Sequence, residues 1–218
     1  MQFFKAAIFD FNGTLFWDTA YHDKAFDVFL EKHNIQLTDD EKRVKIHGKG
    51  NPDIMRGIFG PHLTDEQVDE MAQEKELIYR QLCVNNLHFA PGAEDLFNFL
   101  KDEGIPMTIA TSAGIENVDF YFEHMQLDKW FSIDKVAYND GTFRGKPHPD
   151  VFQVAAQKLN LQPQETVMFE DSMAGILSAE SAGAGKIYIV NSYGENYSRF
   201  SYEIITDFSQ VDRNLFEK

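Results

Sequence analysis

Residues 6–15 of the chain read AAIFDFNGTL, an apolar run that stops at an aspartate and is followed by a Gly-Thr turn. The run predicts a buried strand over residues 3–11, with Asp10 at its carboxyl end. A buried carboxylate is costly unless it is paired, binds a metal ion or changes its protonation state. Open α/β sheets bind their ligands at the carboxyl ends of the strands. Asp10 is therefore a candidate nucleophile or metal ligand, although an aspartate that only caps the next turn would give the same pattern.

The composition narrows the classes of function. With 218 residues and 43% hydrophobic residues, the chain can bury one α/β domain with a smaller inserted domain. A formal charge of −15 argues against general affinity for nucleic acids or anionic membranes, while leaving room for a local phosphate pocket. The sequence shows neither a signal peptide nor an apolar run of bilayer length, so we expect a cytoplasmic protein. The single cysteine, Cys83, is interpreted as a buried helix residue.

The order of the predicted elements indicates a helical insertion in an α/β fold. Residues 17–88 look almost wholly helical, and Thr64 with Gln67 forms a capping-box pattern at the start of a long helix. From residue 89 onward helices and strands alternate, which predicts a parallel sheet with helices on both faces. We expect a discontinuous core, 1–16 and 89–218, and a helical cap, 17–88. The core helices are expected at 93–103, 115–125, 150–159 and 174–182, and its further strands at 105–110, 135–138, 166–169 and 186–190.

Polar residues follow several of the predicted strands, as Asp10 does. Thr111 and Ser112 follow one strand, Glu170 and Asp171 follow another, and Lys146 lies after a short strand and a turn. The carboxyl ends of parallel strands share one edge of a sheet, so these side chains can converge. Three carboxylates suit a hard cation such as Mg²⁺, whereas a hydroxyl and an ammonium suit phosphate oxygens.

Each of these signals has an ordinary structural explanation when it is taken alone. Thr111-Ser112 is more often a helix N-cap, Lys146 a solvated lysine, and Glu170-Asp171 the start of a loop. What makes coincidence a poor explanation is the family resemblance described next, which requires these residues in this order after strands. The combination indicates phosphoryl transfer by positioning and charge neutralisation.

The same residues resemble the four motifs of the haloacid dehalogenase superfamily. The first motif usually reads Asp-x-Asp-Gly-Thr, and here Asn12 replaces its second acid. Thr111, Lys146 and the Glu170-Asp171 pair are similar to the second, third and fourth motifs. The stretch 170–183 and a cap between the first two motifs are typical of the phosphatase and β-phosphoglucomutase branch. The resemblance implies a Rossmann-like core that carries a helical cap.

The resemblance also implies roles for individual residues. Asp10 would attack phosphorus to give an aspartyl-phosphate, with Mg²⁺ held by Asp10, Glu170, Asp171 and the backbone carbonyl of Asn12. Thr111, Ser112 and Lys146 would bind the transferring group. The expected function is a Mg²⁺-dependent phosphatase of a small phosphorylated metabolite. The competing hypothesis is a phosphometabolite-binding protein of the same fold with little turnover.

Asn12 keeps open the hypothesis of a phosphometabolite-binding protein with little turnover. In the family pattern the second acid protonates the leaving group and then activates water, and such acid–base help contributes roughly 10²–10⁴-fold. A carboxamide offers no exchangeable proton for this step. The substitution would matter least for substrates with good leaving groups.

Three other activities of the superfamily fit less well. Dehalogenases lack the second acid but use no metal, which Glu170-Asp171 argues against. Phosphonate hydrolases form a Schiff base on a cap lysine, for which Lys49 is a poor motif match. A phosphomutase would carry an arginine near Asn51, although His22 matches a histidine at its cap hinge. Substrate choice is expected to depend on His22, Lys49 and Asn51, and the sequence does not fix the oligomeric state.

Overall fold

The computed structural model describes residues 3–46 and 50–216, which fall into two compact units. One unit comprises Met1–Trp17 with Leu87–Lys218, and the other comprises Asp18–Asn86. These bounds differ by one or two residues from the division that we proposed from the sequence.

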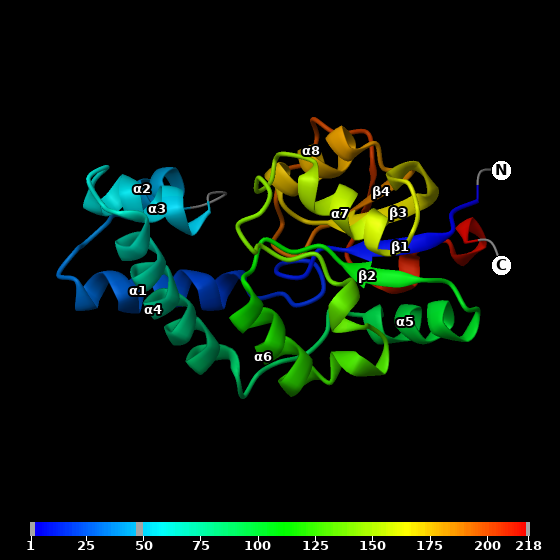
Figure 1. Cartoon of the computed structure of the whole chain (residues 1–218), viewed down its shortest axis with the longest axis horizontal. Helices are drawn as coiled ribbons and strands as arrows, with labels where there is room; N and C mark the ends of the chain where they lie inside the picture. Colours follow the sequence, from blue (N-terminus) through cyan, green and yellow to red (C-terminus); the bar gives the residue numbers. More distant parts are fainter. Residues whose placement is uncertain (1–2, 47–49, 217–218) are drawn as a thin grey trace. The chain divides into compact units, whose positions relative to one another are not determined.

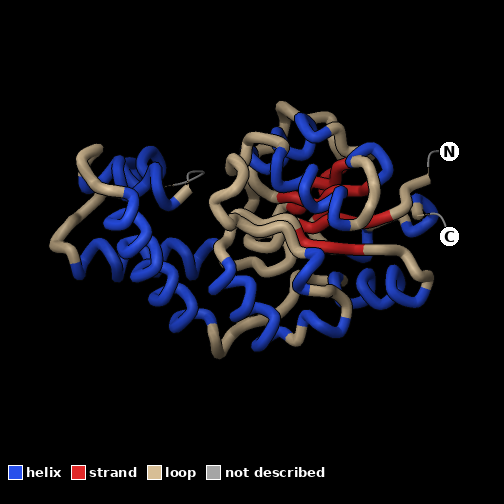
Figure 2. The backbone as a smooth tube through the Cα atoms, viewed as in Figure 1, coloured by secondary structure: helices blue, strands red, loops and turns tan. Residues whose placement is uncertain are grey.

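The first unit is built on one parallel sheet. In the described part of the chain five strands pair in the order β2-β1-β3-β4-β5 (Figure 2). All four pairings are parallel, so the carboxyl ends of the strands lie at one edge. The strands are β1 (Ala6–Phe9), β2 (Met107–Ile109), β3 (Thr166–Glu170), β4 (Lys186–Val190) and β5 (Glu203–Ile205).

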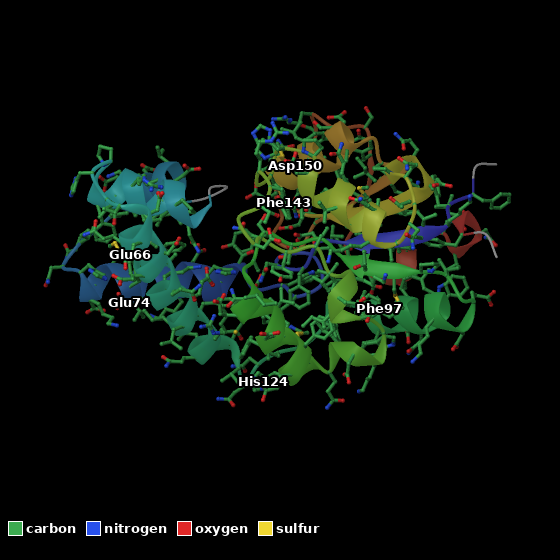
Figure 3. The ribbon with its side chains drawn as sticks, viewed as in Figure 1. Glu66, Glu74, Phe97, His124, Phe143 and Asp150 are labelled. Carbon is green, nitrogen blue, oxygen red and sulfur yellow. The ribbon has the colours of Figure 1, made fainter. Side chains whose placement is uncertain are left out.

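The two faces of the sheet bury different side chains because successive strand residues point to opposite faces. Ile8 pairs in register with Met168, and both belong to a core cluster that includes Phe152. Their neighbours Phe9 and Phe169 stack with ring centroids 4.7 Å apart. On that second face Phe97, labelled in Figure 3, meets Phe9 edge-on at 5.4 Å.

Helices cover both faces, as Figure 1 shows. The helices α7 (Asp150–Lys158) and α8 (Met173–Ala182) lie on one face, and α5 (Ala93–Asp102) and α6 (Ile115–Met125) on the other. The predicted Rossmann-like α/β fold is therefore confirmed. Short 3₁₀ turns occupy Leu127–Lys129, Ile133–Lys135, Pro163–Glu165, Phe208–Gln210 and Arg213–Leu215.

The second unit has a helical core of its own. Its helices are α1 (Thr19–Lys32), α2 (Asp39–Lys45), α3 (Asn51–Phe59) and α4 (Asp65–Cys83). Phe29 of α1 and Tyr79 of α4 are fully buried. The capping box is present at the start of α4, where the Thr64 side chain accepts from the backbone N–H of Gln67 at 3.2 Å. Within residues 3–46 and 50–216, none of the helices combines the length and apolarity that a membrane span needs.

One predicted strand is wrong, and another was missed. Residues 135–138 contribute only a single bridge between Ala137 and Ala110, after the 3₁₀ turn Ile133–Lys135. This short bridge extends the edge of the sheet beyond β2 without adding a strand. The unpredicted β5 is three residues long with Ile204 exposed, so it carries too little apolar pattern to be recognised.

Candidate active site

Three carboxylates meet at the carboxyl edge of the sheet. Asp10 follows β1, Glu170 ends β3, and Asp171 comes next. One carboxylate oxygen from each lies within 4.8 Å of the others. Because β1 and β3 are adjacent parallel strands, this convergence follows from the topology.

A buried lysine joins two of these carboxylates. Lys146 Nζ donates to Asp10 Oδ1 at 2.5 Å and to Glu170 Oε2 at 2.6 Å. It also reaches the backbone carbonyl of Ala110 at 3.3 Å, at the end of β2. The Lys146 side chain is 7% exposed, so this ion pair is shielded from water. The solvated-lysine explanation for Lys146 is therefore wrong.

The loop that carries Lys146 is anchored on both sides. Phe143 packs against the core cluster beneath α7. Arg144 forms an ion pair with Asp150 at 2.9 Å, at the first residue of α7. Phe143 and Asp150 are labelled in Figure 3 and lie near each other there. These contacts hold a loop without regular structure where its lysine reaches three strand ends.

Burial and the excess of negative charge raise the pKa values of Asp10 and Asp171. Burial and the neighbouring Glu170 raise the pKa of Asp10 to about 7, against the opposing effect of Lys146. Burial, Glu170 and Asp10 also raise the pKa of Asp171. Burial disfavours the charge on Lys146, but Asp10 and Glu170 outweigh it and raise the pKa of this lysine. One ammonium thus faces three carboxyl groups, an arrangement that favours a further cation.

Two glycines bring the backbone close to the acids. A Cβ on Gly13 would stand 2.1 Å from Asp171 Oδ2, and Gly13 has a φ of +81°. A Cβ on Gly175 would stand 1.9 Å from Glu170 Cδ. Thr14 Oγ1 donates to Asp171 Oδ1 at 3.1 Å. The Gly-Thr pair after Asp10 therefore both makes room for Asp171 and binds it.

Glu170 is also tied to the start of α8. Its Oε1 accepts from the backbone N–H and the hydroxyl of Ser172, at 3.0 Å and 2.8 Å. The Ser172 hydroxyl in turn accepts from the N–H of Gly175 at 3.0 Å and caps the helix. The acidic pair is thus built into the junction between strand and helix.

Asn12 is directed toward α6. Its Nδ2 donates to the hydroxyl of Tyr121 at 2.7 Å. The Tyr121 ring is fully buried and stacks on Phe11, with centroids 4.2 Å apart. Asn12 itself is half-buried. The amide therefore has a defined partner that the sequence did not reveal.

Thr111 and Ser112 follow β2 as predicted but differ in environment. Thr111 is buried, and its hydroxyl accepts from the N–H of Ala113 at 3.1 Å. The N-cap of α6 is Gly114, so Thr111 is not the helix cap. Ser112 is exposed. Lys146 contacts the backbone carbonyl of Ala110, the residue before Thr111. The backbone of Thr111 therefore lies beside the acidic group.

The other predicted site residues belong to the helical unit. His22 Nδ1 lies 2.9 Å from Lys75 Nζ, and Asn51 Nδ2 donates to Glu76 Oε1 at 2.9 Å. Lys49 lies outside the described residues. Against the effect of burial, Lys75 and His22 lower the pKa of Glu76 to about 2. His22 and Asn51 thus belong to a polar cluster within their own unit.

Three residues of interest were missed by sequence reasoning. Lys75 could have been found, because it comes seven residues after buried Val68 and four before buried Tyr79, on the apolar side of α4. The other two are Tyr121 and Tyr197, whose hydroxyl donates to the backbone carbonyl of Asp171 at 2.5 Å. Neither carries such a signal, since buried tyrosines in an apolar pattern look like ordinary core residues. Cys83 is buried as predicted, and burial raises the pKa of its thiol to about 11.

Comparisons with known proteins agree with this geometry. The model of the haloacid dehalogenase-like hydrolase family matches residues 4–183. A family IA hydrolase of this superfamily from Entamoeba histolytica has a crystal structure that superposes with a TM-score of 0.89 at 33% identity, over 99% of this chain and 97% of that one. A phosphorylated carbohydrates phosphatase of Thermotoga maritima is 28% identical, over 88% of each chain.

A β-phosphoglucomutase from Clostridium difficile shares the fold, with a TM-score of 0.78 at 24% identity over 97% of this chain and 94% of that one. These matches confirm the resemblance that the four sequence motifs indicated, including its phosphatase and β-phosphoglucomutase branch.

Proposed function

Because the chain belongs to the haloacid dehalogenase-like hydrolase family, we propose that it is a Mg²⁺-dependent phosphatase of a small phosphorylated sugar. The observation that carries this proposal is the Asp10 carboxylate, which is hydrogen-bonded to buried Lys146 and lies beside Glu170 and Asp171. The carbohydrate-phosphate substrates named for the Thermotoga maritima relative support the choice of substrate class.

The donor set fits Mg²⁺. Three carboxylates converge on one spot, and one lysine leaves their charge only partly compensated. Hard oxygen donors at a rigid strand edge are what this ion prefers. Asp10, Glu170, Asp171 and the backbone carbonyl of Asn12 would hold it. When bound, Mg²⁺ supplies positive charge for the phosphoryl oxygens.

The chain's own groups account for the remaining steps except proton transfer to the leaving group and from the attacking water. An oxygen of Asp10 attacks phosphorus while the bond from phosphorus to the leaving oxygen breaks, and the leaving oxygen takes its proton from solvent. Water then attacks the phosphorus of the aspartyl-phosphate, which releases inorganic phosphate and the Asp10 carboxylate. Lys146 orients Asp10 and neutralises charge on the transferring group. Thr111 and Ser112 supply hydroxyl donors at the next strand end. Burial of Asp10 and Lys146 strengthens these interactions.

Asn12 favours a second candidate, a phosphometabolite-binding protein with little turnover. Its amide gives no proton to a leaving group, and it is already engaged by Tyr121. We propose that turnover is attenuated for alkyl phosphates and best for substrates that leave without protonation. We further propose that His22, Lys49 and Asn51 contribute to substrate choice.

A screen of phosphorylated sugars with and without Mg²⁺ tests the proposal. Asp10→Asn, which keeps the shape of the side chain, should lower turnover by more than about 10³-fold. Asp95→Asn, at an exposed position of α5, is the matched control and should leave turnover unchanged. Retention of full turnover by the Asp10 variant would refute the assignment of the nucleophile.

Binding of beryllium fluoride with Mg²⁺ separates the two candidates, because it mimics phosphorylated aspartate without needing turnover. Thermal stabilisation of the wild type, but not of Asp10→Asn, together with turnover of a sugar phosphate supports the phosphatase. The same stabilisation without turnover of any ester in the screen supports the binding protein.

A further inference from the structure

Tyr197 contacts the acidic group from a segment that the catalytic proposal does not use. It lies between β4 and β5, far in sequence from the four motifs. Its hydroxyl donates to the backbone carbonyl of Asp171 at 2.5 Å. Tyr197 is 4% exposed, so this hydrogen bond is shielded from solvent.

The position of the phenol is fixed by packing. The Tyr197 ring belongs to a buried apolar cluster with Ile176 of α8 and Ile189 of β4. Phe200 and Tyr202, from the same segment as Tyr197, pack against this cluster. The hydroxyl is therefore a donor held rigidly at one place.

Asp171 is thereby held at two points. Thr14 binds its carboxylate and Tyr197 binds its backbone carbonyl. The Asp171 carboxylate occupies space that a Cβ on residue 13 would need, 2.1 Å from its Oδ2, so Gly13 makes room for it in this position. Mg²⁺ demands near-ideal octahedral geometry, so small displacements of a ligand are costly.

We infer that Tyr197 is a positioning residue that orients Asp171 for binding Mg²⁺. The inference rests on the proposed function in taking Asp171 as a metal ligand. Partners that orient metal ligands typically contribute roughly 10–100-fold to metal affinity. Loss of the phenol should therefore weaken Mg²⁺ binding while leaving the ligands themselves in place.

Titration calorimetry with Mg²⁺ alone tests this on Tyr197→Phe, which keeps the ring and removes the hydroxyl. We expect the dissociation constant to rise about tenfold. The matched control is Tyr202→Phe, because the Tyr202 hydroxyl donates to Glu180 at 2.9 Å from the same cluster. Its affinity for Mg²⁺ should equal that of the wild type. An affinity of Tyr197→Phe within about twofold of the wild type would overturn the inference.

A packing role and a positioning role are separated by two further measurements. Ile189→Val loosens the same cluster but keeps the phenol, so it should bind Mg²⁺ like the wild type. In turnover assays, excess Mg²⁺ should restore the kcat of Tyr197→Phe, since the ligands are all present. Equal loss of affinity in Ile189→Val and Tyr197→Phe would show that packing alone is responsible and would overturn the inference.

The calorimetry does not depend on turnover. Wild-type protein that binds Mg²⁺ but hydrolyses no phosphate ester would refute the proposed function. The ratio of the Mg²⁺ dissociation constants of Tyr197→Phe and the wild type would still decide the inference about Tyr197. Wild-type protein that binds no Mg²⁺ would overturn both.

Discussion

At the scale of single residues, position 12 is where this chain departs from the first motif of its family, and we propose that this residue governs how the site handles the leaving group. One carboxylate oxygen each of Asp10, Glu170 and Asp171 lies within 4.8 Å of the others. Lys146 binds Asp10 and Glu170, whereas Asn12 donates its amide to Tyr121. In the proposed mechanism the role left unfilled is proton transfer to the leaving oxygen and from the attacking water. The effect of restoring it can be measured directly.

Asn12→Asp should raise phosphatase activity, because an aspartate of nearly the same shape gains an exchangeable proton. The rise should approach roughly 10²–10⁴-fold for alkyl phosphates and be smaller for nitrophenyl phosphate, whose leaving group needs no protonation. Steady-state kinetics on both substrate types provides the measurement. Asn139→Asp, in an exposed turn, should leave both rates unchanged.

An unchanged rate in Asn12→Asp, with Mg²⁺ binding intact, would contradict this prediction. It would mean that the site is adapted to chemistry that needs no such acid, and would favour a phosphonate, an acyl phosphate or a binding role.

At the scale of elements, α4 carries a buried ion pair within the helical unit. Lys75 Nζ donates to Glu76 Oε1 at 2.8 Å, and its side chain is 3% exposed. The same ammonium lies 4.6 Å from the centroid of the Phe26 ring on α1. The pair thus links the two long helices of this unit, and its charges depend on each other for solvation.

Glu76→Gln should lower the free energy of unfolding by roughly 2–3 kcal/mol at about pH 7, because it removes the anion that balances Lys75. The pKa of Glu76 is about 2 in the folded protein, whereas its ordinary value is 4.5, so the stabilisation is complete above pH 4.5. It is lost as the pH falls toward 2, so the penalty should be about half as large near pH 3.

Denaturant unfolding at the two pH values measures this difference. Glu70→Gln, on an exposed position of the same helix, controls for the loss of one charge and should have little effect at either pH. A penalty for Glu76→Gln that is independent of pH would show that the ion pair does not stabilise the fold.

At the scale of the whole molecule, the candidate ligands for Mg²⁺ belong to only one of the two units. Asp10, Asn12, Glu170 and Asp171 all lie in the unit formed by Met1–Trp17 and Leu87–Lys218. The helical unit has its own core and its own ion pair. A ligand that binds the native state raises the free energy of opening of the elements that hold it.

Mg²⁺ alone should therefore slow amide hydrogen exchange in β1 and β3 while leaving α1 and α4 unchanged. Hydrogen exchange followed by mass spectrometry resolves these elements. In Asp171→Asn the protection of β1 and β3 should be largely lost. Equal protection of both units on adding Mg²⁺ would contradict a site confined to one of them.

The fold class and the identity of the acidic group follow from the sequence alone. The alternation of strands and helices after residue 89 predicts a parallel sheet covered on both faces, and every parallel strand brings its carboxyl end to the same edge. Asp10, Glu170, Asp171 and Lys146 were predicted together for that reason. The prediction of a strand at 135–138 failed because a single bridge needs no pattern of its own.

Two tyrosines that contact residues of the candidate site are visible only in the folded structure. Tyr121 and Tyr197 are buried like ordinary aromatic core residues, and their hydroxyls meet Asn12 and Asp171 across more than 20 residues of sequence. Local periodicity reports which face of an element is apolar, but it contains no information on which distant polar atom a buried hydroxyl meets. That pairing depends on the packing of whole elements, which is why the sequence could predict that these charged residues converge but could not predict which groups contact them.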